Sequence, residues 1–513
     1  MVKLVDTRDL KSLGASHAGS TPAPGTWYVH RFRLRITPSA QMRILSPQPL
    51  DRAQLLARLR DEAPWDAVII GGGATGLGIA LDAAARGLRV ALVEQRDFAS
   101  GTSSRSTKLI HGGVRYLAQG NVKLVREALT ERAVLRTLAP ELVRPLEFIV
   151  PCYRFGEREF MRAGLGLYDL LAGHASLGAT RWLTRRDTLR RLPGVRAEGL
   201  LGGVSYWDAQ FDDAAMAIAL MQTACALGAT AVNYVACTAL DNAGGRIEAV
   251  RVRDVETGEH FRLRTRCVFN AAGVWVDAIR RQADAGLMPV TTVSQGSHIV
   301  IDRCFMPAGA AMLIPRTRDG RVLFVVPWYG SLVIGTTDVA RADAPLEPAV
   351  DPTEEAFLLR TAGDYLADAP QPGDVRARFS GLRPLLSAAG VGATARLSRE
   401  HAVLIEASNL VSAVGGKWTT YRRMAQDAID AAQRAGVLPS SCASVTAHVR
   451  LIPPAFPCED AAGFRARIAD EAFIDWSRRF TQARTLEDIR ARRTRLDFID
   501  QSRPTSAMAS GAK

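Results

Sequence analysis

The chain has 513 residues, of which 47% are hydrophobic and 23% charged, and its formal net charge is +13. This length exceeds what one hydrophobic core usually supports, so we expect at least two domains. No apolar run reaches about 18 residues, which argues against a membrane-spanning helix. The seven cysteines lack C-x-x-C spacing. We therefore expect no disulfide framework and no metal site, and a reducing cytoplasm fits.

The positive charge has several interpretations. An arginine-rich surface explains it without any function, whereas an anionic substrate or an anionic membrane leaflet would make use of it. A protein that binds nucleic acid is a further alternative. We expect no nucleic-acid partner, because basic and aromatic residues do not interleave as a stacking platform requires.

The first 43 residues do not have the pattern of folded protein. Residues 12–26 are rich in Gly, Ser, Ala and Pro without usable periodicity, and residues 1–43 carry +5 of the net charge. The opening twelve residues resemble the translation of a transfer-RNA gene. We expect residues 1–43 to be a non-native or disordered extension, with translation starting at Met42. A short amphipathic helix is predicted over 51–61.

A glycine-rich turn is the strongest signal in the chain. An apolar run leads into Gly71-Gly-Gly-Ala-Thr-Gly76, and a second apolar run ends at Glu94. This order predicts a strand, a tight turn, a helix and a second strand. Gly71 would permit the turn, Gly73 the approach of a pyrophosphate and Gly76 the packing of helix on sheet. The helix N-terminus would bind the phosphates and Glu94 a ribose, but the motif does not separate FAD from NAD.

The rest of the chain alternates between helices and strands. Periodic segments predict helices, and short apolar segments bounded by turn residues predict strands. Helices are expected at 122–138, 164–171, 214–227, 352–367 and 460–503, and strands at 146–150, 231–235, 247–252, 261–263, 267–270, 298–301, 322–326, 331–334 and 410–414. Nucleotide-binding elements thus recur at 66–94, 267–280 and 410–435, with a β-rich region between them.

Residues 102–116 form a dense polar cluster directly after the second predicted strand. They read Thr-Ser-Ser-Arg-Ser-Thr-Lys-Leu-Ile-His-Gly-Gly-Val-Arg-Tyr. Hydroxyls and glycines can approach phosphate oxygens and a flavin edge with little bulk. The alternative is a polar surface loop, but Leu109-Ile110 indicates that part of it is buried.

Three shorter clusters are candidates to complete the site. His298 is either a structural histidine or a base. Arg383, in a Gly-Leu-Arg-Pro turn, is better placed than most arginines to bind an anion through two parallel N–H groups of its guanidinium. Lys417 follows a second glycine turn, Gly415-Gly416. If that turn is more than a structural connection, it would stabilise a reduced flavin anion.

At these four clusters the chain resembles the FAD-dependent, quinone-linked glycerol-3-phosphate dehydrogenases, over roughly residues 64–450. The block around Thr107-Lys-Leu-Ile-His-Gly-Gly is distinctive, although threonine replaces the family's serine. Pro327-Trp328 and Gly335-Thr-Thr-Asp338 also match.

The resemblance implies an α/β fold, with a Rossmann-type FAD-binding domain interleaved with a β-rich substrate domain and a short helical C-terminal cap. The oxidoreductase region would span 51–450. Its FAD-binding segments would be 64–145, 205–280 and 400–435, and its substrate-domain segments 146–204 and 281–399. Residues 451–513 would be a truncated cap and tail.

The resemblance also assigns roles to residues. FAD would be bound by Gly71, Gly73, Gly76, Glu94, Thr102, Ser103, Ser104, Lys108, Gly273, Gly415, Gly416, Lys417 and Thr419. Glycerol 3-phosphate would be bound by Arg115, Tyr116, Arg383, Arg399 and Lys417. The catalytic set would be His298, Thr336, Arg383 and Lys417.

The implied reaction is oxidation of sn-glycerol 3-phosphate to dihydroxyacetone phosphate by hydride transfer to FAD, with electrons passed to a membrane quinone. A base must take the hydroxyl proton, and His298, Lys417 or an arginine-assisted water are the candidates. The alternative is a related FAD-dependent oxidase that uses O₂ or an amine substrate. An amine would not need this set of cations.

We expect a cytoplasmic protein that is peripheral on the inner face of the cytoplasmic membrane, with a homodimer as the candidate assembly. Membrane contact would come from helix 51–61 or from the arginine-rich tail. Both segments are equally consistent with ordinary solvated helices.

Overall fold

The computed structural model describes residues 45–118, 120–317, 321–387, 401–406, 409–454 and 460–501. These all belong to one unit, residues 35–513. The predicted extension, 1–43, lies outside the described residues, and so does Arg399. Among the described helices, none is long and apolar enough to span a bilayer.

A six-stranded sheet carries the glycine turns. Its order is β18-β19-β11-β1-β2-β7, and all neighbours are parallel except β18 against β19. The strands are β1 (Ala67–Ile70), β2 (Val90–Val93), β7 (Thr230–Val232), β11 (Val268–Asn270), β18 (His401–Ile405) and β19 (Leu410–Gly415). Strands β1 and β2 are apolar throughout because both faces of this sheet are covered.

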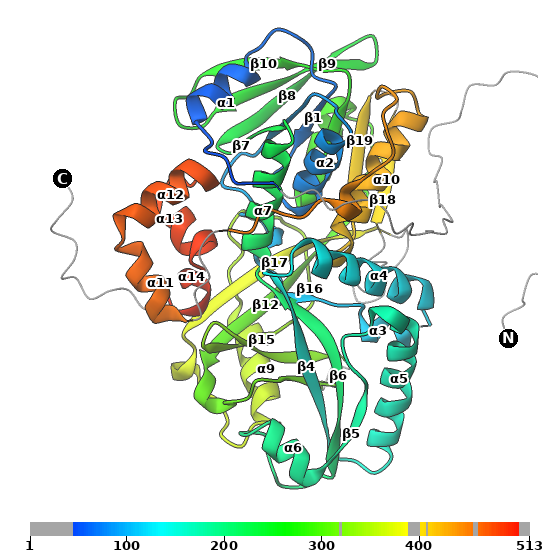
Figure 1. Ribbon diagram of the computed structural model, residues 1–513, viewed down its shortest axis with the longest axis vertical. Helices are drawn as coiled ribbons and strands as arrows, with labels where there is room; N and C mark the ends of the chain where they lie inside the picture. The colour runs from blue at the N-terminus through cyan, green and yellow to red at the C-terminus, as the bar shows by residue number, and fades with distance from the viewer. Residues whose placement is uncertain are drawn as a thin grey trace, which may run out of the picture. The chain divides into compact units, whose positions relative to one another are not determined.

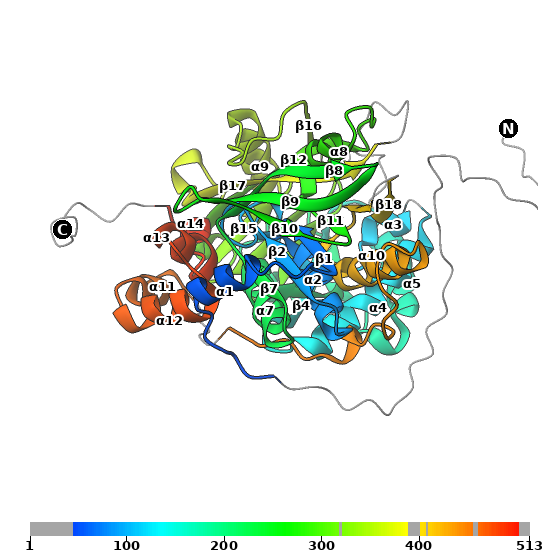
Figure 2. The ribbon, with the colours of Figure 1, turned by 90° about the horizontal axis from the view of Figure 1, so that it is seen from above.

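Alternate residues of β1 enter different cores. Ala67 and Ile69 face three helices that pack side by side, α2 (Ala74–Ala85), α7 (Asp213–Ala226) and α10 (Tyr421–Arg434). Val68 and Ile70 face the opposite layer, which contains α1 (Arg52–Leu59) and a three-stranded antiparallel sheet. The strands of that sheet are β8 (Val235–Ala243), β9 (Arg246–Asp254) and β10 (His260–Arg264). Figure 2 shows these layers from above.

A ten-stranded sheet forms the β-rich region, in the lower part of Figure 1. Its main order is β16-β12-β15-β14-β13-β4-β6-β3, with β17 paired to β12 and β5 to β6. The strands are β3 (Leu109–Ile110), β4 (Val143–Cys152), β5 (Arg181–Thr184), β6 (Gly202–Phe211), β12 (Thr291–Asp302), β13 (Ala311–Ile314), β14 (Leu323–Trp328), β15 (Ser331–Gly335), β16 (Val339–Arg341) and β17 (Ala377–Leu386).

Helices cover both faces of this sheet. On one face, the core contains residues of α9 (Pro352–Gly363), and α6 (Arg185–Arg191) packs against that core. The other contains residues of α3 (Val114–Ala118), α4 (Val122–Leu138) and α5 (Glu157–Ala172). α8 (Val276–Ala283) lies against the six-stranded sheet instead, through β11 and β19.

The C-terminal segment is helical and packs into the rest of the fold. It contains α11 (Ala461–Ile468), α12 (Glu471–Thr481), α13 (Leu486–Asp488), a π-helical turn (Ile489–Arg493) and α14 (Leu496–Ile499). Its arginines form buried ion pairs, from Arg492 and Arg493 to Asp97 and from Arg495 to Asp213. The tail therefore does not present these arginines as a free basic surface.

The fold class is as expected, with two differences in detail. β6 lies in the antiparallel sheet, although residues 205–211 were expected in the FAD-binding part. It pairs with β4 along ten residues, so strand pairing places it there regardless of sequence order. The apolar side of α1, Leu55, Leu56 and Leu59, is buried in the core beneath the small sheet and cannot contact a membrane.

Candidate active site

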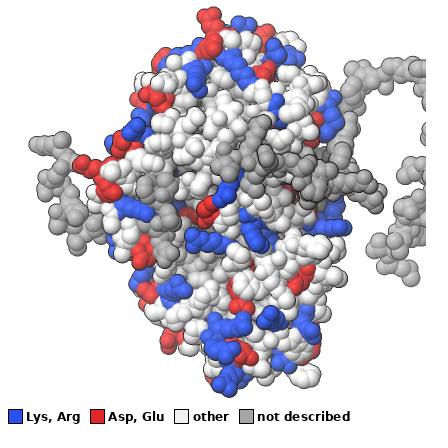
Figure 3. Space-filling view, in the orientation of Figure 1, with Lys and Arg blue, Asp and Glu red and all other residues white. Residues whose placement is uncertain are grey.

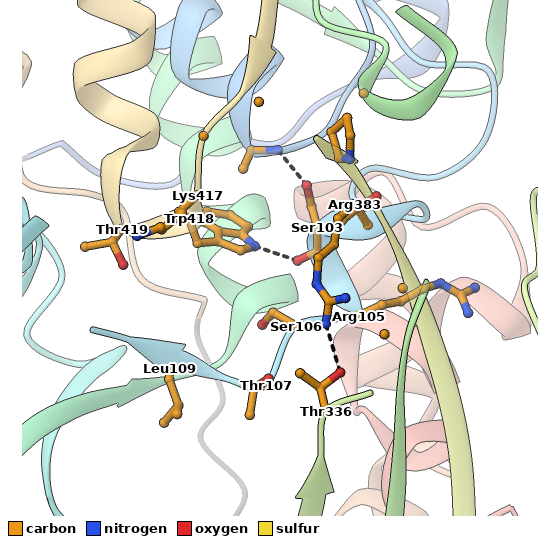
Figure 4. Close-up of a pocket in the computed structure, with 18 of the residues that line it drawn as sticks. Ser103, Arg105, Ser106, Thr107, Leu109, Thr336, Arg383, Lys417, Trp418 and Thr419 are labelled. Atoms are coloured by element: carbon orange, nitrogen blue, oxygen red, sulfur yellow. Dashed lines mark hydrogen bonds between the residues drawn. The ribbon is translucent and has the colours of Figure 1, made fainter. Parts of the chain in front are cut away.

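A cavity of about 1150 Å³ is bounded by residues of both large sheets. This volume slightly exceeds the range of about 300–1,000 Å³ that is typical of small-molecule sites. Its wall includes the first glycine turn, the loop after β2, the second glycine turn after β19, and side chains of β12 and β17. Part of this wall is drawn in Figure 4. The segments singled out in the sequence thus meet around one space.

The first glycine turn has the geometry its sequence predicts. Gly71 has a φ of +109°, and an added Cβ would lie 2.6 Å from the carbonyl oxygen of Ala271. An added Cβ at Gly76 would collide with the carbonyl oxygen of Gly71, so α2 approaches β1 closely only because residue 76 is glycine. Gly73 is the N-cap of α2 and provides no side chain to cap the helix. The helix N-terminus therefore borders the cavity with backbone N–H groups, which suits a pyrophosphate.

Glu94 lies at the end of β2 and lines the cavity. Its carboxylate accepts hydrogen bonds from the backbone N–H groups of Gly72, at 2.7 Å, and Arg96, at 2.9 Å. Burial raises the pKa of Glu94, although these two N–H groups oppose the shift. The carboxylate is therefore held in place beside the turn, as a ribose-binding acid at this position would be.

The polar loop after β2 divides into two sides. Thr102 and Ser103 line the cavity, and Ser103 Oγ accepts a hydrogen bond from the N–H of Ala74 at 2.9 Å. Ser104 and Lys108 are not among the residues that line it. Lys108 is fully buried and donates to the carbonyl of Ser104 and to Asp213, at 2.7 and 2.8 Å. Ser104 and Lys108, both predicted to bind the cofactor, therefore lie behind the residues that face the cavity.

The second glycine turn completes the wall on the side of the six-stranded sheet. Gly415 and Gly416 have φ of +74° and +79°, and both line the cavity with Gly273 and Thr419. Thr419 exchanges hydrogen bonds with the backbone of His111. Trp418 Nε1 donates to the carbonyl of Ser103 at 2.8 Å, which ties the two cofactor-side loops together (Figure 4).

His298 lies on β12 and is 2% exposed. Its ring stacks on Phe379 of β17, with centroids 4.6 Å apart, and its Nε2 lies 3.0 Å from Thr107 Oγ1. Its Nδ1 has no hydrogen-bond partner among the described residues. Burial, helped by the charges of Lys108 and Arg383, lowers the pKa of His298 well below 6.5. The imidazole is therefore neutral at physiological pH, the form that a general base requires.

Arg383 crosses from β17 into the cavity above Gly296 of β12. A Cβ at Gly296 would collide with the guanidinium, so glycine is needed for this approach. Arg383 Nη2 donates to Thr336 Oγ1 at 2.9 Å and to the carbonyl of Thr337 at 3.1 Å (Figure 4). Thr336 directly follows Gly335, the β15 residue that pairs with His298. The predicted catalytic residues His298, Thr336 and Arg383 are therefore neighbours.

Lys417 brings a second cation to the same cavity. Its Nζ lies 3.8 Å from the ring centroid of Tyr116, a cation–π contact that orients the ammonium. Both residues line the cavity. Arg115 belongs to α3, but its side chain is not among those described. The two remaining predicted phosphate ligands, Arg115 and Arg399, thus stay predictions.

Two residues important to this geometry were not assigned roles from the sequence. Thr107, recognised only as a departure from the family's serine, is the partner of His298. Arg105 lines the cavity and forms an ion pair with Glu347, which also pairs with Arg96. Both lie inside the polar cluster at 102–116, but a linear pattern does not reveal partners that are about two hundred residues away.

Comparisons with known proteins agree with this site. Residues 66–422 match the family described as FAD dependent oxidoreductase. The chain is 40% identical to mitochondrial glycerol-3-phosphate dehydrogenase of Mus musculus over 400 residues, covering 75% of this chain and 55% of that protein. It is 44% identical to glycerol-3-phosphate dehydrogenase of Mycobacterium leprae over 386 residues, covering 75% and 65%. The matched region thus spans just over half to about two thirds of these relatives' length.

A solved structure extends the likeness to three dimensions. The glycerol-3-phosphate dehydrogenase from Bacillus halodurans complexed with FAD superposes with a TM-score of 0.68 at 28% identity, covering 86% of this chain and 88% of that one. The glycine-lined wall described above suits that cofactor, so the prediction of FAD is confirmed. The chain belongs to the FAD-dependent oxidoreductases, and within that family it groups with the glycerol-3-phosphate dehydrogenases.

Proposed function

We propose that this protein oxidises sn-glycerol 3-phosphate to dihydroxyacetone phosphate. The observation that carries the proposal is the meeting of two cations, Arg383 and Lys417, with a neutral buried histidine in one cavity that also contains the FAD-type glycine turns. A phosphorylated alcohol needs cations for its phosphate and a base for its hydroxyl. Both requirements are met here by residues of separate strands and loops.

Each residue has a proposed role. FAD, when bound, supplies the acceptor for the hydride that leaves the alcohol carbon. Arg383 and Lys417 bind the phosphate and favour the alkoxide that develops as the proton leaves. His298 accepts the hydroxyl proton, and its hydrogen bond with Thr107 Oγ1 fixes the orientation of the imidazole. Arg383 also donates a hydrogen bond to the Thr336 hydroxyl and so orients that hydroxyl in the same cavity.

We propose a membrane quinone as the electron acceptor, approaching by way of α5. Large apolar side chains are exposed on α5 and beside it: Phe155 is 102% exposed, Phe160 72% and Leu170 76%. Phe160 and Leu167 also line the cavity. Monomeric soluble proteins rarely expose such contiguous apolar surface without a partner. An apolar acceptor would therefore approach the cavity along α5, where Phe160 and Leu167 are both exposed and line the cavity.

Basic residues surround these apolar side chains. The guanidinium groups of Arg158 and Arg162 lie over the ring of Trp182, at 4.5 and 5.1 Å. Exposed arginines of β5 and α6 continue the charge, and Lys and Arg gather over these elements at the lower end of Figure 3. Apolar side chains ringed by arginines suit the surface of an anionic bilayer. The homodimer stays a prediction.

The substrate and the acceptor are tested together. Purified flavin-loaded protein is assayed with glycerol 3-phosphate and either a soluble quinone analogue or O₂. We expect turnover with the quinone analogue and little peroxide with O₂. Equal or faster turnover with O₂ would contradict the quinone proposal, and absence of turnover with either acceptor would contradict the substrate.

The membrane surface has its own test. Replacing Phe155 and Leu170 together by serine should weaken binding to anionic vesicles by about 100-fold or more, because each large side chain contributes roughly 1.5–3 kcal/mol when fully transferred from water. Neither residue lines the cavity, so reduction of the flavin by substrate should be unchanged. Unchanged co-sedimentation would contradict the role of this surface.

A further inference from the structure

The C-terminal segment packs behind the active-site wall, although it is distant in the sequence from the residues that face the cavity. Arg495, between the π-helical turn and α14, is 1% exposed. Its Nη2 donates to Asp213 Oδ1 at 3.0 Å and to the carbonyl of Ser104 at 2.8 Å. Its Nη1 donates to the carbonyl of Ala491 at 2.8 Å. One buried guanidinium thus joins the C-terminal segment to α7 and to the loop after β2.

Asp213 transmits this contact to the loop. Its Oδ2 accepts from the N–H and the hydroxyl of Ser106, at 3.1 and 2.6 Å, and from Lys108 Nζ at 2.8 Å. Residues on both sides of Thr107 are therefore bound to one carboxylate. Thr107 itself is the hydrogen-bond partner of His298. The position of the Thr107 hydroxyl depends on Asp213, and the position of Asp213 depends on Arg495.

A second contact reaches the imidazole from the same segment. Phe498 of α14 packs on Phe379, with ring centroids 4.9 Å apart, and Phe379 stacks on His298. The guanidinium of Arg495 lies 4.2 Å from the centroid of Phe498. The imidazole is thus fixed at Nε2 by the loop and at its face by an aromatic pair, and both supports include α14 or the residue before it.

The charges around this cluster nearly balance. Two carboxylates and one guanidinium face Lys108 Nζ: Asp213 at the start of α7, Asp212 at its N-cap, and Arg495. The rings of Trp328, Phe379 and Phe498 also lie near it. Burial, together with Arg495, lowers the pKa of Lys108 to about 7. Asp213 has a lowered pKa because Lys108 and Arg495 outweigh the effect of its burial. The carboxylate is therefore ionised and able to hold the loop.

We propose that Arg495 is a positioning residue for His298, acting through Asp213 and Thr107 on one side and through Phe498 and Phe379 on the other. This inference rests on the proposed function, in which His298 accepts the substrate proton. The C-terminal helices are then a part of the catalytic apparatus, although they contribute no residue to the cavity wall among the described residues. A misplaced base slows proton transfer without weakening the binding of the phosphate.

The test compares Arg495→Met and Arg495→Lys with Arg490→Met. Arg490 pairs with Asp497 in the same segment but is partly exposed and makes no described contact with the His298 supports, so it is a matched control. We expect Arg495→Met to lower kcat by about 10- to 100-fold with KM changed less than about threefold. Arg495→Lys should recover part of kcat, and Arg490→Met should resemble the wild type.

A double variant separates positioning from general stability. If Arg495 acts through His298, adding Arg495→Met to His298→Asn should lower kcat less than about twofold further, because the group being positioned is already absent. Equal effects in both backgrounds, no effect in either, or the same loss from Arg490→Met would overturn the inference. If Arg495→Met does not yield flavin-loaded protein, Phe498→Leu replaces it in the same comparison. Failure of the wild type to oxidise glycerol 3-phosphate would refute the proposed function instead.

Discussion

The two walls of the cavity differ in whether backbone or side-chain atoms face the ligand. The wall toward the six-stranded sheet is mainly backbone at Gly71, Gly73 and Gly415, where turns and a helix N-terminus present N–H groups. The wall toward the ten-stranded sheet consists of side chains, above all His298 and Arg383. At Gly71 and Gly76 the turn has no room for an added Cβ, whereas the side-chain wall depends on charge and protonation. Changes on the first should therefore remove the cofactor, and changes on the second should alter rates and affinities.

The largest effect is expected on the backbone wall. Gly76→Ala adds a Cβ that would collide with the carbonyl oxygen of Gly71, so α2 must move away from β1. We expect the protein to purify without FAD and with a lower Tm. Gly309→Ala is the control, because an added Cβ there meets nothing within 4 Å. A Gly76→Ala protein with full flavin content would contradict the prediction that the turn cannot accommodate an added Cβ at this position.

Replacing the base should affect the rate alone. His298→Asn removes the proton acceptor but leaves the cofactor wall intact, so we expect full flavin content and a loss of about 10²- to 10⁴-fold in kcat. Flavin absorbance and steady-state kinetics measure the two quantities. A kcat within a few-fold of the wild type would exclude His298 as the base and favour Lys417 or a water.

The phosphate-binding arginine should affect affinity most. Arg383→Met removes hydrogen bonds from a charged donor, each worth about 1.5–3 kcal/mol, so we expect KM for glycerol 3-phosphate to rise about 10- to 100-fold. Arg378→Met is the matched control on the same strand, since Arg378 pairs with Glu355 outside the cavity. Unchanged KM and kcat would remove Arg383 from the proposed site.

The smallest effect is a pH dependence of stability. The pKa of His298 is lowered in the folded state, so below 6.5 the unfolded chain binds a proton that the folded chain does not. The wild type should therefore lose stability as pH falls through 6.5, by at most about 1.4 kcal/mol per pH unit for this group, and show no contribution from it above 6.5. Chemical denaturation of wild type and His298→Asn from pH 7.5 to 5.5 measures the difference. Parallel curves would contradict the lowered pKa.

The same contrast explains what the sequence could predict. The positive φ of Gly71 and the close contact of Gly76 with Gly71 are local requirements, so a short motif revealed both the turn and its purpose. The contact between Thr107 and His298 joins a loop and a strand that are 191 positions apart in the chain and meet only in the folded protein. The family resemblance assigns Ser104 and Lys108 to the cofactor, and a polar loop pattern does not reveal that these two side chains lie behind the cavity wall. Arg495 belongs to the arginine-rich tail, for which the sequence leaves membrane contact and a solvated helix open, and it is instead buried against Asp213.

The central claim is that the backbone wall holds FAD while the side-chain wall delivers a phosphorylated alcohol to it. The most direct test mixes oxidised, flavin-loaded enzyme with glycerol 3-phosphate in the absence of oxygen and follows the flavin absorbance. We predict rapid, stoichiometric loss of the oxidised spectrum in the wild type and a much slower loss in His298→Asn. A wild-type flavin that stays oxidised with saturating glycerol 3-phosphate would contradict the account.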